Sequence, residues 1–362
     1  MTVTATTQTG LIALSDLSPA DHGRWRELAD AAAEPNPFYE PEFVSALAPV
    51  LGGRDLSLLV ARRGSDWLAC APVHSPGRWH HMPLRGIANW QTPYTYLGSP
   101  LYRAGEGDEV LGELTASALA TSGSFLGLDL LPADADSTAT FVSRVAPAQS
   151  LIFKRFQRAV LIRRSDVHYL AIRPKHRREI QRLGRRLQEH LDTSLEVTDV
   201  AGEAAAVDEF LALERSGWKG RQGTAMAELE GHGAFFQRLC EGFARRGRLQ
   251  LLALRANGRA IAMKCNLRAG SHLYCFKIAY DDAFARFSPG MQLELANIDA
   301  FVADDSVEMA DSCAEPNNQM INRLWADRRE LITVALGAPG VAGRAALASI
   351  RVAANARRLR GA

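Results

Sequence analysis

The chain has 362 residues, of which 47% are hydrophobic and 23% charged, so it is long enough for two or three domains of ordinary globular composition. This composition excludes wholesale disorder, and a net charge of +2 gives the chain as a whole no strong attraction to nucleic acid or to an anionic membrane. The five cysteines are odd in number and form no CxxC pair, which argues against a disulfide framework or a zinc cage and favours reduced thiols in a cytoplasmic protein.

The first ten residues are polar and lack the basic and apolar regions of a signal peptide. No run of ~18 apolar residues is present in the sequence. We therefore expect a cytoplasmic protein without a membrane span.

Local signals in the first half of the chain predict both helices and strands. Ser18-Pro19 is a typical helix start, because serine caps the first amides and proline fits the first helical turn. Residues 64–66, Gly-Ser-Asp, predict a turn between two apolar strands. The elements expected are helices over 19–31, 42–51 and 107–121, a further short helix within 132–150, and strands over 56–62, 67–73, 125–131 and 160–162.

The second half begins with a basic helix and then contains three closely spaced strands. Asn257-Gly258 predicts a tight hairpin between the first two of these strands. Apolar residues at helical spacing predict the helix that follows the third. The elements expected are helices over 174–189, 204–217, 232–246 and 291–303, and strands over 194–200, 249–255, 260–267, 272–280 and 306–310.

One internal repeat is visible in the sequence. Residues 58–70 match the pattern of residues 251–263 without a gap, at an offset of 193 residues, about half the chain. The match favours duplication of one folding unit. The alternative is that two ordinary hairpins look alike by chance.

Residues 281–290 carry the chain from a strand end to a helix start. A helix N-terminus exposes backbone N–H groups and the positive end of the helix dipole, which suits a phosphate. We expect Ser288 to cap the helix, Pro289 to occupy its first position, and Gly290 to let a ligand approach the backbone. Arg286 adds a charge for direct contact with an anion. The alternative is a well-capped helix with no ligand.

Several short stretches resemble the CelD/BcsL-type family of GNAT acyltransferases. The most specific are Phe276-Lys277-Ile278-Ala279-Tyr280-Asp281 and Phe287-Ser288-Pro289-Gly290, and residues 36–38, 41–43, 177–183 and 216–220 also fit. The resemblance extends over about residues 25–335. Such families are similar to the FemABX transferases, which carry two GNAT-like folds in tandem.

The resemblance implies an α+β protein with tandem GNAT-like folds, whose mixed, mostly antiparallel sheets are flanked by helices. The internal repeat fits this architecture independently. We expect a degenerate N-terminal GNAT-like domain at 11–165, a C-terminal GNAT domain with the donor site at 166–336, and a C-terminal tail rich in Ala and Arg at 337–362.

The resemblance also implies a reaction that uses acetyl-CoA or another acyl-CoA as co-substrate and no metal. An amine of a small molecule or a sugar would attack the thioester, while a base removes its proton and backbone N–H groups polarise the carbonyl. The residues expected to hold the pyrophosphate are Arg286, Phe287, Ser288, Pro289, Gly290 and Met291.

Three side chains are candidates for the chemistry. Lys277 is expected at a cleft or at a solvated edge, and regular alternation places it on the face of Cys275, opposite Phe276. Tyr280 is either an acid for the departing thiolate or a core tyrosine. Asp311 follows the last strand, where a carboxylate either orients or deprotonates an amine or only caps a loop.

Trp218 and Lys219 end a helix and are expected to form a wall of the acceptor site, with plain packing as the alternative. Cys313 has no histidine nearby in the sequence, so we expect an inert thiol rather than a nucleophile. His80 and His81 are adjacent on an extended chain and point apart, which argues against a metal site.

The segment 173–190 carries seven Lys or Arg against two Glu. It is either a solvated helix docked by its apolar face or a patch for an anionic partner such as CoA phosphates, a nucleotide-linked sugar or a tRNA end. The lack of interleaved aromatic residues weakens the RNA interpretation.

Two alternatives to a CoA-dependent N-acyltransferase stay open. One is a FemABX-like transferase that uses aminoacyl-tRNA, which a long coiled-coil arm would favour; only the helix at 174–189 is predicted. The other is a non-catalytic binding protein with the GNAT fold. The reduced loop Ser288-Pro289-Gly290 favours it, because GNAT loops usually have a basic or polar residue followed by two spaced glycines.

Overall fold

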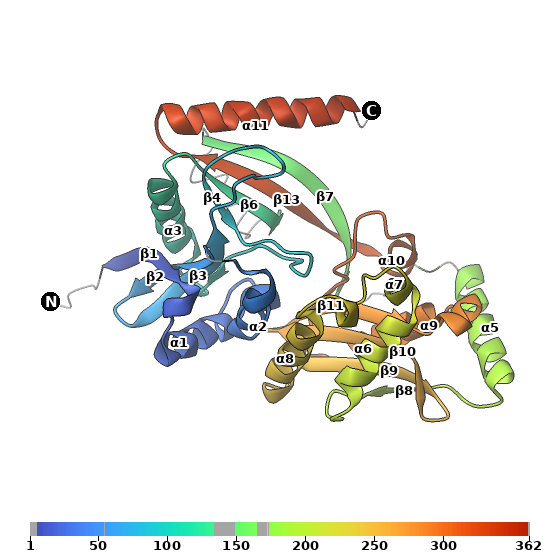
Figure 1. Ribbon diagram of the computed structural model, residues 1–362. Helices are drawn as coiled ribbons and strands as arrows, with labels where there is room; N and C mark the ends of the chain where they lie inside the picture. Colours follow the sequence, from blue (N-terminus) through green and yellow to red (C-terminus); the bar gives the residue numbers. More distant parts are fainter. Residues whose placement is uncertain (1–5, 54, 134–148, 165–171, 173, 361–362) are drawn as a thin grey trace. The chain divides into compact units, whose positions relative to one another are not determined.

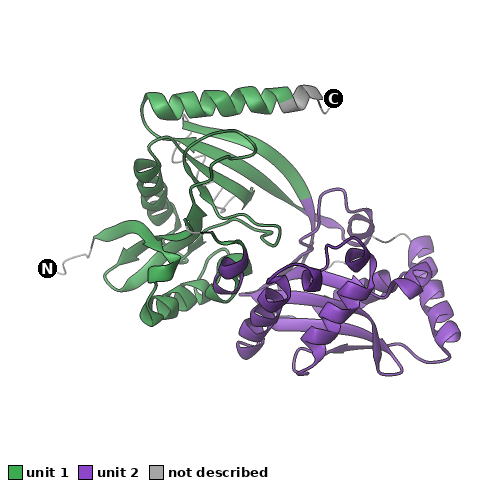
Figure 2. Ribbon diagram, in the orientation of Figure 1, with its two compact units in different colours: residues 1–44, 51–157, 329–362 green, residues 45–50, 158–328 purple. Residues whose placement is uncertain are grey.

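The computed structural model describes residues 6–53, 55–133, 149–164, 172 and 174–360 (Figure 1). It divides into two compact units, residues 1–44, 51–157 and 329–362 in unit 1 and residues 45–50 and 158–328 in unit 2 (Figure 2). The units interleave along the chain, whereas the sequence patterns predict consecutive domains with boundaries at 165 and 336. Each unit is described by itself below.

Both halves of the chain follow one order of elements: a strand, two helices, three strands, a helix and a strand. The first half contains β1 (Thr7–Ala13), α1 (Pro19–Asp30), α2 (Pro41–Leu51), β2 (Ser57–Arg63), β3 (Asp66–His74), β4 (Ile87–Asn89), α3 (Gly107–Ser122) and β6 (Phe125–Pro132). The second half contains β8 (Glu196–Asp199), α6 (Ala206–Ser216), α8 (His232–Arg245), β9 (Leu249–Ala256), β10 (Arg259–Ala269), β11 (His272–Tyr280), α9 (Pro289–Ala303) and β12 (Met309–Asp311).

Further elements are added to this order. They are β5 (Leu101–Tyr102), β7 (Ser150–Ile162), α5 (Pro174–Leu191), α7 (Trp218–Arg221), α10 (Gln319–Leu324), β13 (Asp327–Gly337), α11 (Val341–Arg360) and the 3-10 helices η1 (Leu14–Asp16), η2 (Pro37–Tyr39), η4 (Met226–Glu228) and η5 (Asp282–Phe287). The elements expected from the sequence are present with shifted ends, except that the short helix expected within 132–150 lies mostly outside the described residues.

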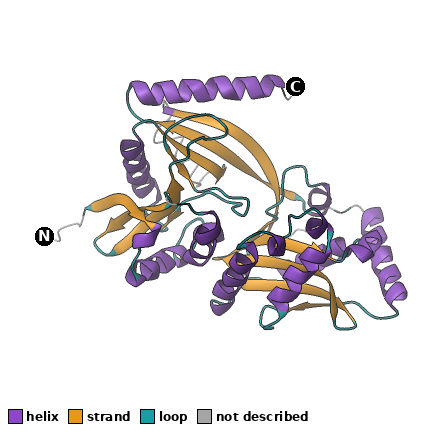
Figure 3. Ribbon diagram, in the orientation of Figure 1, coloured by secondary structure: helices purple, strands orange, loops and turns teal. Residues whose placement is uncertain are grey.

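The strand pairing repeats as well. The strand order is β1-β2-β3-β4-β6 in the first half and β8-β9-β10-β11-β12 in the second. In each set the first three neighbour pairs are antiparallel and the last pair, β4–β6 or β11–β12, is parallel. The fold is therefore an α+β fold in tandem, with mixed, mostly antiparallel sheets flanked by helices (Figure 3).

The two hairpins that match in sequence also share an irregularity. In the β2–β3 pair, Leu68 is an extra residue opposite Ala61 and Arg62. In the β9–β10 pair, Ile261 is the extra residue. The ungapped repeat aligns Leu68 with Ile261 at its offset of 193 residues. A bulge at the same aligned position is not required by a hairpin as such, so it supports duplication of one unit.

Two long strands explain why the units interleave. Strand β7 begins in unit 1, and its last residues, 160–162, pair with β12 in unit 2. Strand β13 begins in unit 2 and returns to pair with β6 in unit 1. The segment expected as a C-terminal tail forms α11, and its Ala346 and Ile350 pack with Phe125 and Trp79 in the core of unit 1.

In unit 2, helices α6 and α8 cover one face of the sheet and α9 covers the other (Figure 3). The core under α9 contains a buried polar network. Lys264 Nζ donates to Glu294 Oε2 at 2.6 Å, and the two side chains are 4% and 0% exposed. Trp325 Nε1 and Asn297 Nδ2 donate to Glu294 Oε1 at 3.0 and 3.2 Å. Burial alone would lower the pKa of Lys264, but Cys275 and Glu294 raise it above its ordinary value, so the ammonium stays charged.

This network fixes α9 on the sheet. We therefore expect a single substitution in it to lower the free energy of unfolding more than a double substitution that removes both charges. Glu294→Leu leaves the Lys264 charge buried without its carboxylate and should lower the free energy of unfolding by about 3–5 kcal/mol. The double variant Lys264→Met/Glu294→Leu removes both charges and should recover at least half of that loss. Urea unfolding of the three proteins measures the difference; a double variant less stable than the single one would contradict this account.

Candidate functional site

Strand β11 contains a β-bulge that decides which side chains share a face. Lys277 pairs with Cys265 whereas Cys275 pairs with Asn266, so Phe276 is the extra residue. Cys265 and Asn266 are neighbours on β10 and point to opposite faces, and so do Lys277 and Cys275. The expectation that Lys277 shares a face with Cys275 is therefore wrong, because the bulge places Lys277 together with Phe276 on the face covered by α6 and α8.

Strands β11 and β12 separate soon after they meet. Their parallel pairing comprises His272–Tyr274 of β11 and Met309–Asp311 of β12. Strand β12 ends there, whereas β11 continues along β10 to Tyr280. Beyond Tyr274, β11 is therefore no longer paired with β12.

The start of α9 differs from the expected cap. Ser288 occupies the N-cap position, but its backbone is left-handed (φ 53°, ψ 54°) and its side chain makes no capping bond. Its carbonyl accepts the N–H groups of Met291 and Gln292 at 3.0 and 3.2 Å. Pro289 has no N–H. Gly290 is buried, and its N–H has no hydrogen-bond partner among the described residues.

A buried backbone N–H without an acceptor is rare in folded proteins. The Gly290 N–H is therefore the most conspicuous donor at this helix start. No acidic residue lies in the first turn of α9, so nothing there offsets the positive end of the helix dipole. The residues predicted to hold a phosphate thus form a helix start in which one backbone amide, that of Gly290, lacks an acceptor, rather than several amides.

A cavity of about 450 Å³ lies beside this helix start, between α5 and the loop before α9. Its basic groups are close together: Arg286 Nη2 lies 3.4 Å from His190 Nε2, and the Arg286 guanidinium lies 4.7 Å from the centroid of the Phe287 ring. Phe287 is buried while Arg286 and His190 are exposed. The lining residues are Leu183, Arg186, Glu189, His190, Arg286 and Phe287.

Helix α5 is held beside the cavity by a close approach to α9. Gln292 Nε2 donates to the Ile180 carbonyl at 2.6 Å. A Cβ on Gly184 would lie 2.9 Å from Gln292 Oε1, so a larger residue there would displace the Gln292 side chain that bonds α9 to α5. Arg186 and His190, which belong to the basic segment predicted as a solvated helix or as a patch for an anionic partner, line the same cavity as Arg286.

Lys277 and Lys219 lie near a carboxylate, Glu214, that is not among the site residues predicted from the sequence. Glu214 of α6 is buried, and it accepts from Lys219 Nζ at 2.6 Å and from the Met226 N–H at 2.8 Å. Burial lowers the pKa of half-buried Lys277, and the Glu214 carboxylate opposes that shift. The signal for Glu214 was its place among buried apolar positions of α6, since a lone acidic residue there needs a partner.

Trp218 starts α7 and is 42% exposed, which is unusual for so large an apolar side chain. The turn before α7 brings Trp218 and Lys219 to the end of β11. A Cβ on Gly217 would lie 3.2 Å from the Tyr280 carbonyl, and a Cβ on Gly220 would lie 1.7 Å from the Arg215 carbonyl. The tight path of α7 therefore requires glycine at position 220.

Tyr280 lies at the end of β11 on the face of α9, opposite Lys277. Its ring contacts Gly290: the position of a Cβ on Gly290 is 3.6 Å from Tyr280 Cδ1. Burial and the nearby Asp282 carboxylate raise the pKa of Tyr280, so its hydroxyl stays protonated at neutral pH and can donate a proton.

Asp311 lies where the two strands part, and its side chain is 0% exposed. Oδ1 accepts the Cys313 N–H at 2.8 Å and lies 3.5 Å from Arg158 Nη1. Oδ2 has no hydrogen-bond partner among the described residues. Burial and the Asp311 carboxylate raise the pKa of the Cys313 thiol well above its ordinary value, as expected for an inert cysteine.

The sequence of unit 2 matches a known domain family. Residues 174–318 match the model of the acetyltransferase (GNAT) domain. Residues 174–318 are a GNAT domain. They include every residue that the sequence analysis assigned to the site. No curated protein matches the chain.

Solved structures show the same fold over most of the chain. A conserved protein of unknown function from Bacteroides thetaiotaomicron has a TM-score of 0.59 at 13% identity and covers 89% of this chain and 98% of its own. FemX has a TM-score of 0.55 at 10% identity, with coverages of 85% and 89%. L-PGS from Bacillus licheniformis has a TM-score of 0.53 at 10% identity, with coverages of 93% and 96%. At these identities the likeness concerns the fold alone.

The first half of the chain has the GNAT order of elements but a different local structure at the corresponding positions. Asn89 at the end of β4 accepts the Asp129 N–H at 2.9 Å and donates to the Asp129 carbonyl at 3.0 Å. These bonds tie β4 to β6 where β11 and β12 part. The first turn of α3 carries Asp108 and Glu109, which repel a phosphate. These two features distinguish the first half from the GNAT domain in unit 2.

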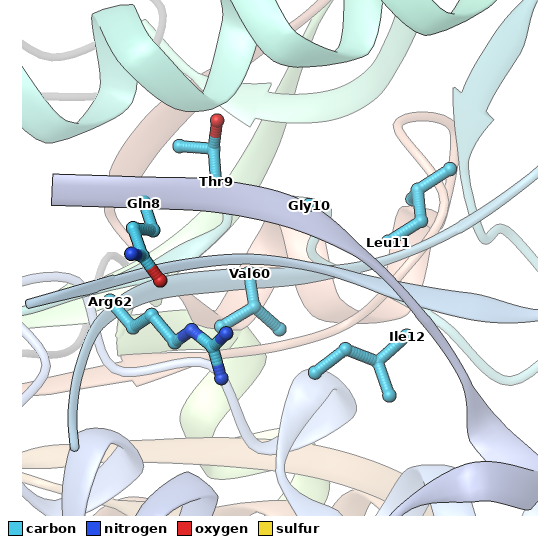
Figure 4. A pocket seen from close by; sticks show the side chains of 7 residues that line it. All are labelled: Gln8, Thr9, Gly10, Leu11, Ile12, Val60 and Arg62. Atoms are coloured by element: carbon cyan, nitrogen blue, oxygen red, sulfur yellow. The ribbon is translucent and has the colours of Figure 1, made fainter. Parts of the chain in front are cut away.

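A second cavity, of about 470 Å³, lies along β1 in unit 1 (Figure 4). Its lining includes one titratable side chain, Arg62. The other lining residues are Gln8, Thr9, Gly10, Leu11, Ile12 and Val60. This cavity lacks the convergent polar groups that chemistry or tight recognition requires.

Within the described ranges, no group of three His, Cys, Asp or Glu side chains is arranged to hold a metal ion. His80 Nε2 instead lies 2.7 Å from Asp129 Oδ1. None of the helices in the described part of the chain has both the length and the apolar character needed to cross a bilayer.

Proposed function

We propose that the GNAT domain is an N-acyltransferase of the CelD/BcsL type, which transfers an acyl group from acetyl-CoA or another acyl-CoA to an amine of a small molecule or a sugar. The observation that carries the proposal is the buried Gly290 N–H, which has no acceptor among the described residues and lies at a helix start beside a basic cavity. A phosphate oxygen supplies the missing acceptor, and the helix dipole favours its charge.

The donor pyrophosphate lies, in this proposal, at Arg286, Phe287, Ser288, Pro289, Gly290 and Met291. Arg286 adds a charged hydrogen bond from the exposed side of the cavity. The pantetheine arm follows the edge of β11 beyond Tyr274, where β12 no longer accompanies it. This path brings the thioester between the helix start and the point where the strands part.

The acceptor amine approaches from the side of Trp218, Lys219 and Lys277 in this proposal. Lys277 takes the proton from the attacking amine, because burial lowers its pKa and makes the neutral form more accessible. Tyr280 donates a proton to the departing thiolate. Asp311 Oδ2 is buried and accepts no hydrogen bond from any described residue. In this proposal it orients the amine or a water molecule where β11 and β12 part.

A second donor class, aminoacyl-tRNA, is favoured by one observation, the exposed basic residues of α5.

The third alternative is a non-catalytic binding protein, which would not need Lys277 to accept a proton. A cytoplasmic location accords with the five cysteines, all of which are free and buried as in a reducing compartment.

Binding of acetyl-CoA tests the donor proposal without knowledge of the acceptor. At 100 times its Kd, acetyl-CoA should raise the free energy of unfolding by about 2.7 kcal/mol. Arg286→Ala should weaken binding about tenfold by removing a charge-assisted bond. Gly290→Ala should keep the fold, because its Cβ meets Tyr280 at 3.6 Å, an ordinary contact, yet should weaken binding by crowding the phosphate.

Thermal unfolding with and without acetyl-CoA measures these effects. Arg245→Ala is a matched control, since Arg245 is an exposed arginine on α8 paired with Glu241. No stabilisation by any acyl-CoA would contradict the proposal, and so would equal binding by the wild type and both loop variants.

The pKa of Lys277 predicts a pH-dependent stability. In the folded state this pKa is below its ordinary value, so the unfolded chain binds the proton more tightly and stability rises with pH between the two pKa values. Lys277→Met removes this penalty. It should therefore stabilise the protein most at neutral pH, by an amount that shrinks as the pH approaches the ordinary lysine pKa of about 10.4.

Urea unfolding from pH 7 to 10 checks this prediction, with the exposed Lys175→Met as a control that should show no such trend. A stability difference that is independent of pH, or that grows with pH, would count against a lowered pKa and against Lys277 as the base.

A further inference from the structure

The exposed face of α5 carries more positive charge than the whole chain. The helix has six Lys or Arg and two Glu, a net charge of +4, whereas the complete chain has a net charge of +2. Its apolar residues Ile180 and Leu187 are buried against the rest of the unit. The positive charge therefore faces solvent and serves no packing function.

Most of these charges have no ion-pair partner within the part of the chain that the structure describes. Arg182 pairs with Glu179 at 2.6 Å. The other basic side chains of α5 are exposed and make no ion pair or hydrogen bond with any described residue. They are Lys175, Arg177, Arg178, Arg185 and Arg186. Like charges held close together on one helix repel each other, so the fold alone gives no reason for them.

The basic face is longer than a single phosphate group requires. Arg186 lines the cavity together with Arg286. Lys175 lies eleven residues earlier on the helix, about 16 Å away along its axis. That separation exceeds the Debye length of about 8 Å at physiological ionic strength, so a phosphate in the cavity would hardly interact with Lys175 or Arg178. The rest of the face fits a partner with negative charge spread over a similar length.

The surroundings of α5 distinguish the possible partners. A bilayer-binding helix presents large apolar side chains for insertion, and none of the exposed large apolar residues among the described ones lies on α5. A single-stranded RNA site has aromatic side chains for stacking, and α5 contains no Phe, Tyr or Trp. An acidic protein surface requires only distributed cations, which is what α5 offers.

We infer that this face docks an acidic carrier protein that delivers the acyl group as a phosphopantetheine thioester. The inference rests on the proposed function and names the form of its donor. The phosphate of the arm lies at Arg186 and Arg286, and the carrier contacts Arg178, Arg182 and Arg185. In the transfer, the amine nitrogen bonds to the acyl carbon, the bond between that carbon and sulfur breaks, and the amine proton ends on the thiol of the carrier arm.

Binding of an acetyl-loaded acyl carrier protein tests this inference, measured by fluorescence anisotropy with the labelled carrier. The double charge reversal Arg178→Glu/Arg185→Glu should weaken carrier binding by at least about tenfold. It should leave acetyl-CoA binding within about twofold of the wild type, because neither residue lines the cavity. Arg344→Glu/Arg351→Glu, at exposed arginines of α11, is the matched control and should change neither.

The outcomes separate this inference from the proposed function. If acetyl-CoA binds but the carrier does not, or binds the charge-reversed variant equally well, the docking inference is wrong and the donor proposal stands. If neither donor binds, both are wrong. If a tRNA mixture or phosphatidylglycerol vesicles bind the wild type more tightly than the carrier does, and the same reversal abolishes that binding, the partner is of another class and the docking inference is overturned.

Discussion

A buried backbone donor in a folded protein needs an acceptor. At the start of α9 in the GNAT domain, the donor that lacks an acceptor among the described residues is the Gly290 N–H. The Ser288 carbonyl accepts the next two amides, and Pro289 has no N–H. The pairing of β11 with β12 ends at Tyr274, and β11 continues without β12 to Tyr280. The buried Lys264–Glu294 pair then fixes α9, and with it the amide, against the sheet.

The two halves of the chain have the same topology but different local structure at corresponding positions. They share the order of elements, the pairing pattern and a bulge at the aligned residues Leu68 and Ile261. In the first half, however, the Asn89 side chain ties the strands together and acidic residues occupy the first turn of the helix. The second half keeps the strands apart and leaves the helix start without acidic residues.

Much of the fold was predictable from local patterns, because hairpin turns, helix starts and apolar periodicity act over a few residues. The bulge at Phe276 was not, since it depends on pairing with β10, and it reversed the expected face of Lys277. The left-handed backbone of Ser288 likewise depends on η5, which no sequence signal indicated. Glu214 joins the site only through the packing of α6, which no local pattern records. The basic segment that contains Arg186 and His190 was visible in the sequence, but its place beside Arg286 was not, because it depends on the packing of α5.

The most direct test of the central claim observes the Gly290 amide itself. In a deuterated, ¹⁵N-labelled sample, titration with acetyl-CoA should move the Gly290 amide resonance downfield and further than the amides of α3, as expected for an N–H that gains a phosphate acceptor. A Gly290 amide that stays unmoved at saturating acetyl-CoA, while other amides shift, would contradict the account.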